Sequence, residues 1–169
     1  PFASTLQRGR RPHVGDTYFL QEEALPIPVI ELPWDSLENL WELLSIPHEV
    51  GHDIETDLGL EDELSEVLAA ALDKAGVTGD DADRWISWRS ELFADFVALQ
   101  LVGPPFAEYL LSLLLSAEKR AFGDEQDEKH PTPYLRILLV CSYVETLLEP
   151  AAANASAAVL ARTQAAKDN

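Results

Sequence analysis

Glycine and proline divide most of this 169-residue chain into segments with helical periodicity. Beyond residue 34 the breaks fall at Gly59, Gly76, Gly103-Pro104-Pro105, Pro133 and Pro150. Because glycine often follows the last residue of a helix and proline favours the first turn, these positions predict where helices end and begin. Between the breaks, apolar residues recur three and four apart, as on an amphipathic helix. The pattern predicts a mainly α-helical domain.

The two ends of the chain lack this periodicity. Residues 1–15 are basic and irregular, and we expect a mobile arm or a truncated linker there. The predicted domain covers residues 16–150, and residues 151–169 form an alanine-rich tail. Residues 27–33 favour an extended strand whose prolines restrict it to a sheet edge. The expected fold class is therefore mainly α with a small N-terminal edge β element (α+β).

The first helix has two possible starts. Asp35 or Ser36 can cap a helix that Pro47 then kinks, or a new helix begins with Ser45 as its cap and Pro47 in its first turn. Both alternatives leave residues 48–58 helical. Further helices are expected over residues 60–75, from about 82 to 102, from 106 to about 122, and from 134 to 149.

The segment His48-Glu49-x-x-His52 matches the H-E-x-x-H pattern of zinc metallopeptidases. Residues four apart lie on one face of a helix, so the two imidazoles can reach one ion, with Glu49 beside them as a general base. An apolar stripe in the preceding residues predicts that this face points into the core. Its members are Leu37, Leu40, Trp41 and Leu44. Gly51 lacks side-chain bulk and would let another segment approach.

A catalytic zinc ion usually has a third protein ligand, and Glu91 is the best candidate. It belongs to an apolar stripe on another predicted helix, where an unpartnered carboxylate is costly. Asp95, one turn later, can accept the outer N–H of a ligand histidine. The alternative is that both acids form ion pairs with arginines, namely Arg84, Arg89 or Arg136.

Other groups could also act as ligands. His13 and His130 are possible from spacing alone. Asp53, Glu55 and Asp57 follow His52 closely, but a third ligand from the same helix is hard to aim at the ion, and we expect most of these acids to be solvated.

The charge, the cysteine content and the apolar runs of the sequence limit the partners and the location that we expect. The net charge of −18 disfavours nucleic acid and anionic membrane surfaces. It mildly favours neutral or basic substrates, but a solvated acidic surface is the preferred interpretation. The single cysteine, Cys141, fits a packed small hydrophobe and gives no support for a disulfide-built secreted fold. The longest apolar run is far shorter than the roughly 20 residues that span a bilayer. We therefore expect a cytoplasmic protein with no membrane span, and the sequence leaves its oligomeric state open.

Three motifs in order carry a family resemblance. They are His48-Glu49-x-x-His52, Glu91-x-x-Ala94-Asp95 and His130-Pro131 with Arg136 after it. The set resembles the gluzincins, and within them the CAAX prenyl protease and heat-shock membrane protease family in its small soluble minigluzincin form. The resemblance covers about half of the chain and implies a zincin-like metallopeptidase domain.

The resemblance also implies roles for these residues. His48, His52 and Glu91 would bind Zn²⁺, Glu49 would be the general base, and Asp95 would orient a ligand histidine. His130 and Arg136 would flank the active site, where they would stabilise the oxyanion or brace the zinc-binding helix. The expected reaction is peptide-bond hydrolysis, with a peptide or protein substrate extended along the strand near residue 29.

Three alternatives remain from the sequence. The domain could bind metal or a partner without catalysis, or it could be a regulatory peptidase domain that cleaves a repressor. It could also be a purely structural helical domain, which predicts no bound metal and arginine contacts to Glu91.

Overall fold

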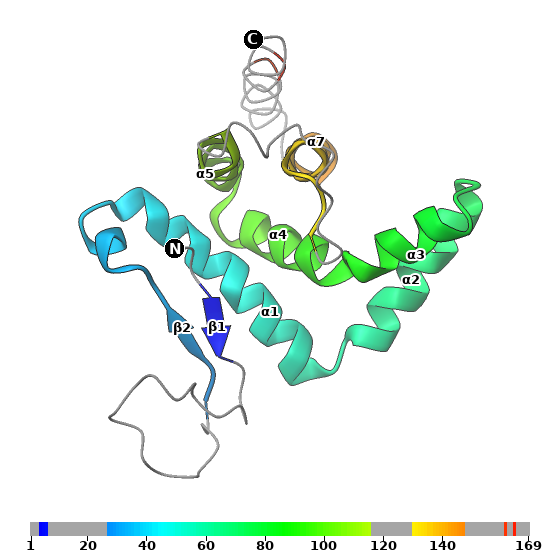
Figure 1. Cartoon of the computed structure of the whole chain (residues 1–169), viewed down its shortest axis with the longest axis horizontal. Coiled ribbons are helices and arrows are strands. Elements are labelled where there is room, and N and C mark those ends of the chain that lie inside the picture. Colours follow the sequence, from blue (N-terminus) through cyan, green and yellow to red (C-terminus); the bar gives the residue numbers. More distant parts are fainter. Residues whose placement is uncertain (1–3, 7–26, 116–129, 148–160, 162–163, 165–169) are drawn as a thin grey trace.

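Figure 1 shows the computed structural model, which describes residues 4–6, 27–115, 130–147, 161 and 164. His13, most of the predicted tail and the predicted helical residues 116–122 lie outside the described residues.

The described elements follow one another as two short strands, two 3₁₀ helices and six α-helices. They are β1 (Ser4–Leu6), β2 (Val29–Glu31), η1 (Trp34–Leu37), η2 (Leu40–Ser45), α1 (Ile46–Leu58), α2 (Glu61–Lys74), α3 (Asp80–Ser87), α4 (Arg89–Val102), α5 (Pro104–Leu115) and α7 (Pro133–Leu147). The predicted fold class, mainly α with a small N-terminal β element, is confirmed. The assignment to a zincin-like fold stays a prediction.

The β element is a two-stranded antiparallel sheet. β1 pairs with β2 in a register that places Ser4 opposite Glu31 and Leu6 opposite Val29. β2 lies where an edge strand was expected, and both strands contact α1. The expectation of an irregular arm over residues 1–15 did not include β1, because three residues are too few for a visible period.

The segment before α1 differs from the prediction. Residues 34–45 form two 3₁₀ helices, and no α-helix begins at Ser36, whose hydroxyl donates to Glu42 instead. The expected core-facing stripe is wrong for three of its four members, because Leu37, Leu40 and Trp41 are 62%, 72% and 43% exposed, and only Leu44 packs against the core. A 3₁₀ helix has three residues per turn, so it does not continue the face that α1 buries.

α1 begins by the second of the two predicted routes. It starts at Ile46, directly after Ser45, and Pro47 lies in its first turn. The expected cap is wrong, because the Ser45 hydroxyl donates to the Glu42 carbonyl and makes no capping hydrogen bond to α1. Gly59 ends the helix in the left-handed conformation with φ of 63°, as the sequence predicted.

The helix expected from residue 82 to residue 102 is in fact two helices. α3 ends at Ser87 and α4 begins at Arg89, with Trp88 between them at φ −88° and ψ −3°. No glycine or proline marks this break, which explains why the sequence did not reveal it. The break matters because it places Ser90 and Glu91 in the first turn of α4.

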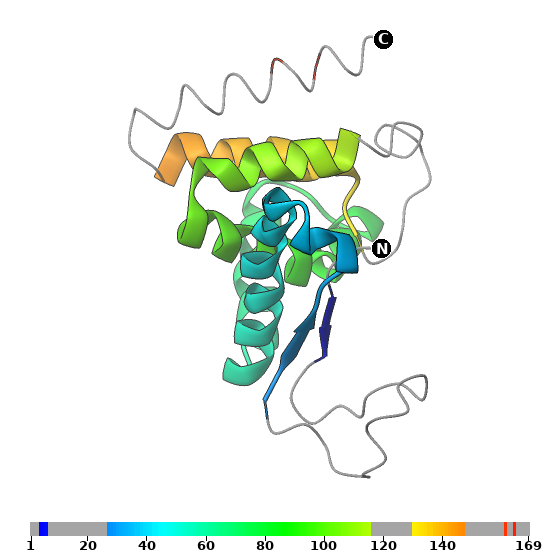
Figure 2. The same cartoon turned by 90° about the vertical axis from the view of Figure 1, so that its left-hand side faces the viewer.

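The hydrophobic core lies mainly between α4, α5 and α7. Figure 2 shows α5 and α7 side by side and lying across the direction of α1. The most buried residues of this core include Leu99, Phe106, Leu110, Leu111 and Val144. Cys141 is buried among them as the expected small hydrophobe. In the part of the chain that the structure describes, no helix combines the length and the apolar character that crossing a membrane requires.

Candidate metal centre

Two imidazoles and one carboxylate converge where α1 passes α4. One potential ligand atom from each of His48, His52 and Glu91 can be chosen such that all three lie within 4.8 Å of one another. The two Nε2 atoms are 3.2 Å apart, and each lies 3.4–3.5 Å from an oxygen of Glu91. Two histidine nitrogens and a glutamate oxygen form a donor set that zinc uses in proteins. The three residues predicted as ligands are therefore brought together.

The close approach of the two helices depends on Gly51. A Cβ at this position would lie 2.6 Å from the Cα of Ala94, a distance that real Cβ atoms do not show. The predicted role of Gly51, to let another segment approach, is confirmed. α1 and α4 thus touch backbone to backbone between the histidine pair and the acidic pair.

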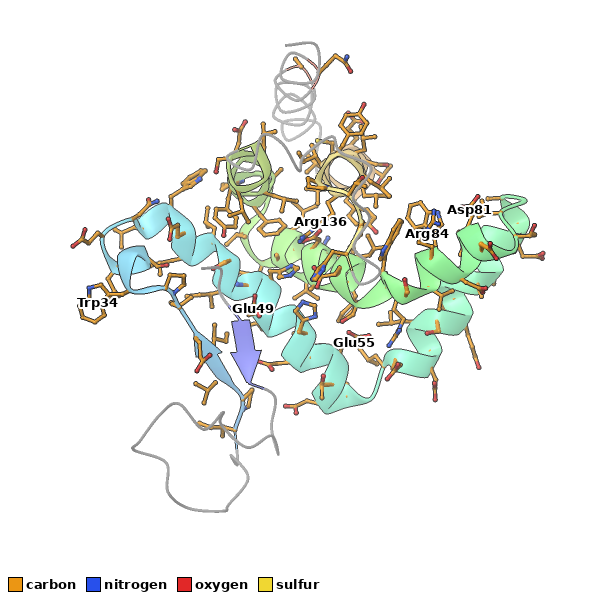
Figure 3. All side chains as sticks on the ribbon, viewed as in Figure 1. Trp34, Glu49, Glu55, Asp81, Arg84 and Arg136 are labelled. Atoms are coloured by element: carbon orange, nitrogen blue, oxygen red, sulfur yellow. The ribbon has the colours of Figure 1, made fainter. Side chains whose placement is uncertain are left out.

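Asp95 links His48 to the last described long helix. Its Oδ1 lies 2.9 Å from His48 Nδ1, and its two oxygens accept hydrogen bonds from Arg136 Nη2 and Nε at 2.7 and 2.8 Å. Arg136 Nη1 also lies 3.5 Å from Glu91 Oε2. Figure 3 shows Arg136 reaching from α7 toward α4. The guanidinium thus braces both acids of α4.

These contacts shift the pKa of each partner. Burial lowers the pKa of His48, but hydrogen bonds to Asp95 and Glu91 outweigh it and raise the value to about 9. Burial acts to raise the pKa of Glu91, yet His48, His52 and the charge of Arg136 hold it well below its usual range. The pKa of Asp95 is lowered because Arg136 and His48 outweigh the burial of its carboxyl group. Both acids are therefore ionised at neutral pH.

Glu49 is buried beside this cluster. It is 8% exposed, and burial raises its pKa, an effect that the charges of His48 and His52 partly offset. A carboxylate with a raised pKa takes up a proton more readily, which suits a general base.

The charges of the cluster match a divalent cation. Glu49, Glu91 and Asp95 bring three negative charges and Arg136 brings one positive charge, so with both imidazoles neutral the group carries a net charge of −2. A buried net charge of this size is costly without a partner. In the metal-free protein the proton on His48 supplies one compensating charge, and a divalent ion would supply two.

His52 has a polar partner that the sequence did not indicate. Its Nδ1 lies 3.0 Å from the hydroxyl of Ser90, which donates a hydrogen bond to Glu55 Oε2. Figure 3 shows Glu55 on α1, on the side that faces the start of α4. Glu55 and Asp53 are 6% and 9% exposed, so the prediction that these acids are solvated is wrong for both. Asp57 is exposed, as expected.

The remaining predicted residue, His130, lies at the rim. Its Nε2 is 3.5 Å from Glu91 Oε1, and its side chain is 48% exposed. The predicted arginine contacts to Glu91 are also present, because Arg136 reaches it. Arg84 instead pairs with Asp81, and Arg89 pairs with Glu55 and Glu61. Glu91 therefore faces two imidazoles as well as the arginine that the structural alternative predicted.

A groove on the described surface lies away from this cluster. It is lined by β2 and by the face of α1 opposite the histidines, through Pro28, Ile30, Val50, Asp53, Ile54, Asp57 and Leu58. Residues 50, 54 and 57 lie on another helical face from residues 48 and 52, so this groove is separate from the histidine cluster.

No family model, curated protein or solved structure matches this chain. The gluzincin resemblance of the three motifs therefore stays a prediction, and the chemistry of the site is argued below from its residues.

Proposed function

We propose that this protein is a zinc-dependent peptidase whose ion is held by His48, His52 and Glu91. The observation that supports the proposal most is the convergence of three potential ligand atoms, within 4.8 Å of one another, from two different helices. Two further features add support: a buried general base, Glu49, and a net charge in the cluster that a divalent cation would neutralise.

In this proposal the ion, when bound, polarises the scissile carbonyl and activates a water molecule. Glu49 accepts the proton of that water and passes it to the leaving amine. Asp95 holds the His48 ring by its Nδ1, and Arg136 holds Asp95 in turn. His130 stands at the exposed rim of the site, where it can donate a hydrogen bond to a substrate oxygen.

The substrate in this proposal is an extended peptide or a peptide segment of a protein. β2 lies against the face of α1 opposite the histidines, so the expected pairing of this peptide with the strand near residue 29 would hold it away from the histidine cluster. The net charge of −18 favours peptides with neutral or basic side chains.

Metal analysis and peptide hydrolysis test the proposal together. The wild-type protein should bind one zinc ion and cleave members of a panel of neutral and basic peptides. Glu91→Ala should lose most of the zinc, whereas Glu66→Ala, which removes an exposed glutamate from α2, should keep it. Unchanged zinc content in Glu91→Ala would remove Glu91 as a ligand.

Glu49→Gln separates metal binding from catalysis. The amide keeps the shape of the side chain but cannot act as a base, so zinc should remain and hydrolysis should fall by about 10²-fold or more. Full activity in this variant would defeat the peptidase mechanism. Stoichiometric zinc without hydrolysis in the wild type would instead identify a non-catalytic metal-binding domain.

A further inference from the structure

A network of polar side-chain contacts runs from His52 away from the cluster that it forms with His48 and Glu91. His52 Nδ1 lies 3.0 Å from Ser90 Oγ, and Ser90 donates to Glu55 Oε2. Glu55 Oε1 lies 3.5 Å from Arg89 Nε, and Arg89 Nη2 lies 2.6 Å from Glu61 Oε1. The side chains of His52, Glu55 and Arg89 are at most 16% exposed, and the bond to Ser90 is partly buried. Glu61, at the far end, is 72% exposed.

The hydrogen bonds of this network determine which ring nitrogen of His52 carries the hydrogen. A serine hydroxyl has one proton to donate, and Ser90 gives it to the carboxylate of Glu55. The oxygen of Ser90 can then only accept from the ring, so Nδ1 of His52 must carry the hydrogen. Nε2 is left with its lone pair free, and this is the atom that faces Glu91 and His48.

The network around His52 resembles the contacts around His48, except that a hydroxyl group lies between the ring and the carboxylate. There a carboxylate, Asp95, contacts Nδ1 directly and is braced by Arg136. Around His52 a carboxylate, Glu55, acts through a hydroxyl and is braced by Arg89. In both cases Nδ1 is held by the protein and Nε2 points toward the other histidine.

We infer that Ser90 and Glu55 are positioning residues that hold His52 as the Nδ1–H tautomer, with Nε2 directed at the metal. The inference rests on the proposed zinc site for its purpose, but the tautomer itself is a property of the metal-free protein. Partners of this kind fix the orientation of a ligand histidine, and removing them typically lowers metal affinity about 10- to 100-fold.

Nitrogen-15 spectra of the histidine rings test the tautomer in zinc-free protein. We expect His52 to have a protonated Nδ1 and a bare Nε2 in the wild type, with its signals assigned by the loss of resonances in His52→Gln. Ser90→Ala should abolish this preference. Ser90→Thr, which keeps a hydroxyl, should restore it.

Glu55→Ala gives a second, independent variant. Without the carboxylate, the Ser90 proton becomes available to His52, so the ring should shift toward the Nε2–H form although the hydroxyl is still present. Ser65→Ala is the matched control, because the hydroxyl of this exposed serine donates to the Glu61 carbonyl of its own helix. A simple loss of packing would not reverse the tautomer in Glu55→Ala.

Zinc competition with a chromophoric chelator completes the test. Affinity should fall about 10- to 100-fold in Ser90→Ala and Glu55→Ala, recover in Ser90→Thr relative to Ser90→Ala, and stay unchanged in Ser65→Ala. An unchanged tautomer in both Ser90→Ala and Glu55→Ala overturns the inference. A changed tautomer with unchanged zinc affinity also overturns it. If the wild type binds no zinc, the proposed function fails, while the ring spectra still decide whether Ser90 and Glu55 set the tautomer.

Discussion

Gly51 and Ala94 form the contact point between the two helices of the site. A Cβ on residue 51 would come within 2.6 Å of the Ala94 Cα and 3.1 Å of its Cβ. The histidines stand three residues before and one residue after Gly51, and Glu91 and Asp95 stand in the same positions around Ala94. Because both pairs keep the same offset, one backbone contact aligns all four side chains.

Gly51→Ala should therefore damage both stability and metal binding. In an ordinary helix this change stabilises by up to about 1 kcal/mol, but here the added methyl meets backbone and forces the helices apart, at a cost of about 1–3 kcal/mol. Zinc affinity should fall as Glu91 moves away from the imidazoles. Urea unfolding and zinc competition measure the two effects.

Ala94→Gly provides the control for this clash. Combined with Gly51→Ala, it removes only the contact at 3.1 Å and leaves the closer one to the Cα at 2.6 Å. The double variant should thus recover little of the lost stability. Wild-type stability and zinc affinity in Gly51→Ala alone would show that the close approach is not needed.

The pKa of His48 predicts how the stability of zinc-free protein depends on pH. This pKa is raised from 6.5 to about 9 in the folded state. A raised pKa means that the folded state holds the proton more tightly, so the stabilisation is fully present below pH 6.5 and is lost as pH rises through 9. The free energy of unfolding should fall over this interval by at most about 3 kcal/mol.

Denaturant unfolding in the presence of a chelator, from pH 6 to pH 10, checks this dependence. His48→Gln removes the titrating ring and should flatten the curve over the same interval. A wild-type curve that already matches that of His48→Gln would contradict the coupling between His48 and its two carboxylates.

The same proton makes zinc binding depend on pH. A histidine binds metal only in its neutral form, so the His48 proton must leave when zinc binds below pH 9. Apparent affinity should rise about tenfold per pH unit between pH 6.5 and 8.5 from this proton alone. Calorimetry in buffers with different ionisation heats counts the released protons, and a count of zero at pH 7.5 would refute the prediction.

Arg136→Ala should be among the most destabilising changes at the site. The guanidinium is 13% exposed and makes two hydrogen bonds to Asp95, which is 2% exposed. Its removal leaves a buried carboxylate with only His48, which costs about 3–5 kcal/mol. Arg136→Lys keeps the charge but not the paired geometry, so its loss of stability should be intermediate.

Arg84→Ala is the matched control for this prediction. Figure 3 shows Arg84 and Asp81 far from the site on α3, and their side chains are 41% and 74% exposed. An exposed pair of this kind contributes about 0–1 kcal/mol. Equal thermal shifts in Arg84→Ala and Arg136→Ala would show that Arg136 does not brace the buried acids.

The residues that converge at the cluster were predictable from the sequence because they obey helical periodicity. His48 and His52 are one turn apart, and Glu91 and Asp95 are one turn apart within an apolar stripe. Gly51 was predictable for a related reason, because a glycine beside two histidines leaves room for a neighbour. Local spacing thus carried the information about both halves of the site.

The partners of His52 were not predictable in the same way. Ser90 faces it only because the chain breaks at Trp88, and no glycine or proline announces this break. Glu55 was predicted to be solvated because nothing near it in sequence buries it. Its burial depends on α4, where its partner Ser90 lies 35 residues further along the sequence. The exposed 3₁₀ residues Leu37 and Leu40 were misjudged because periodicity does not distinguish a 3₁₀ turn from an α-helical one.

The brace on Asp95 comes from Arg136, 41 residues further along the chain. During synthesis, α1 and α4 leave the ribosome well before α7, so the acids of α4 lack their guanidinium while the nascent chain is short. Without this partner Asp95 is poorly held, and the His48 ring that it contacts loses its fixed orientation. The cluster predicted to hold zinc is therefore complete only after α7 has been made and has packed against α4.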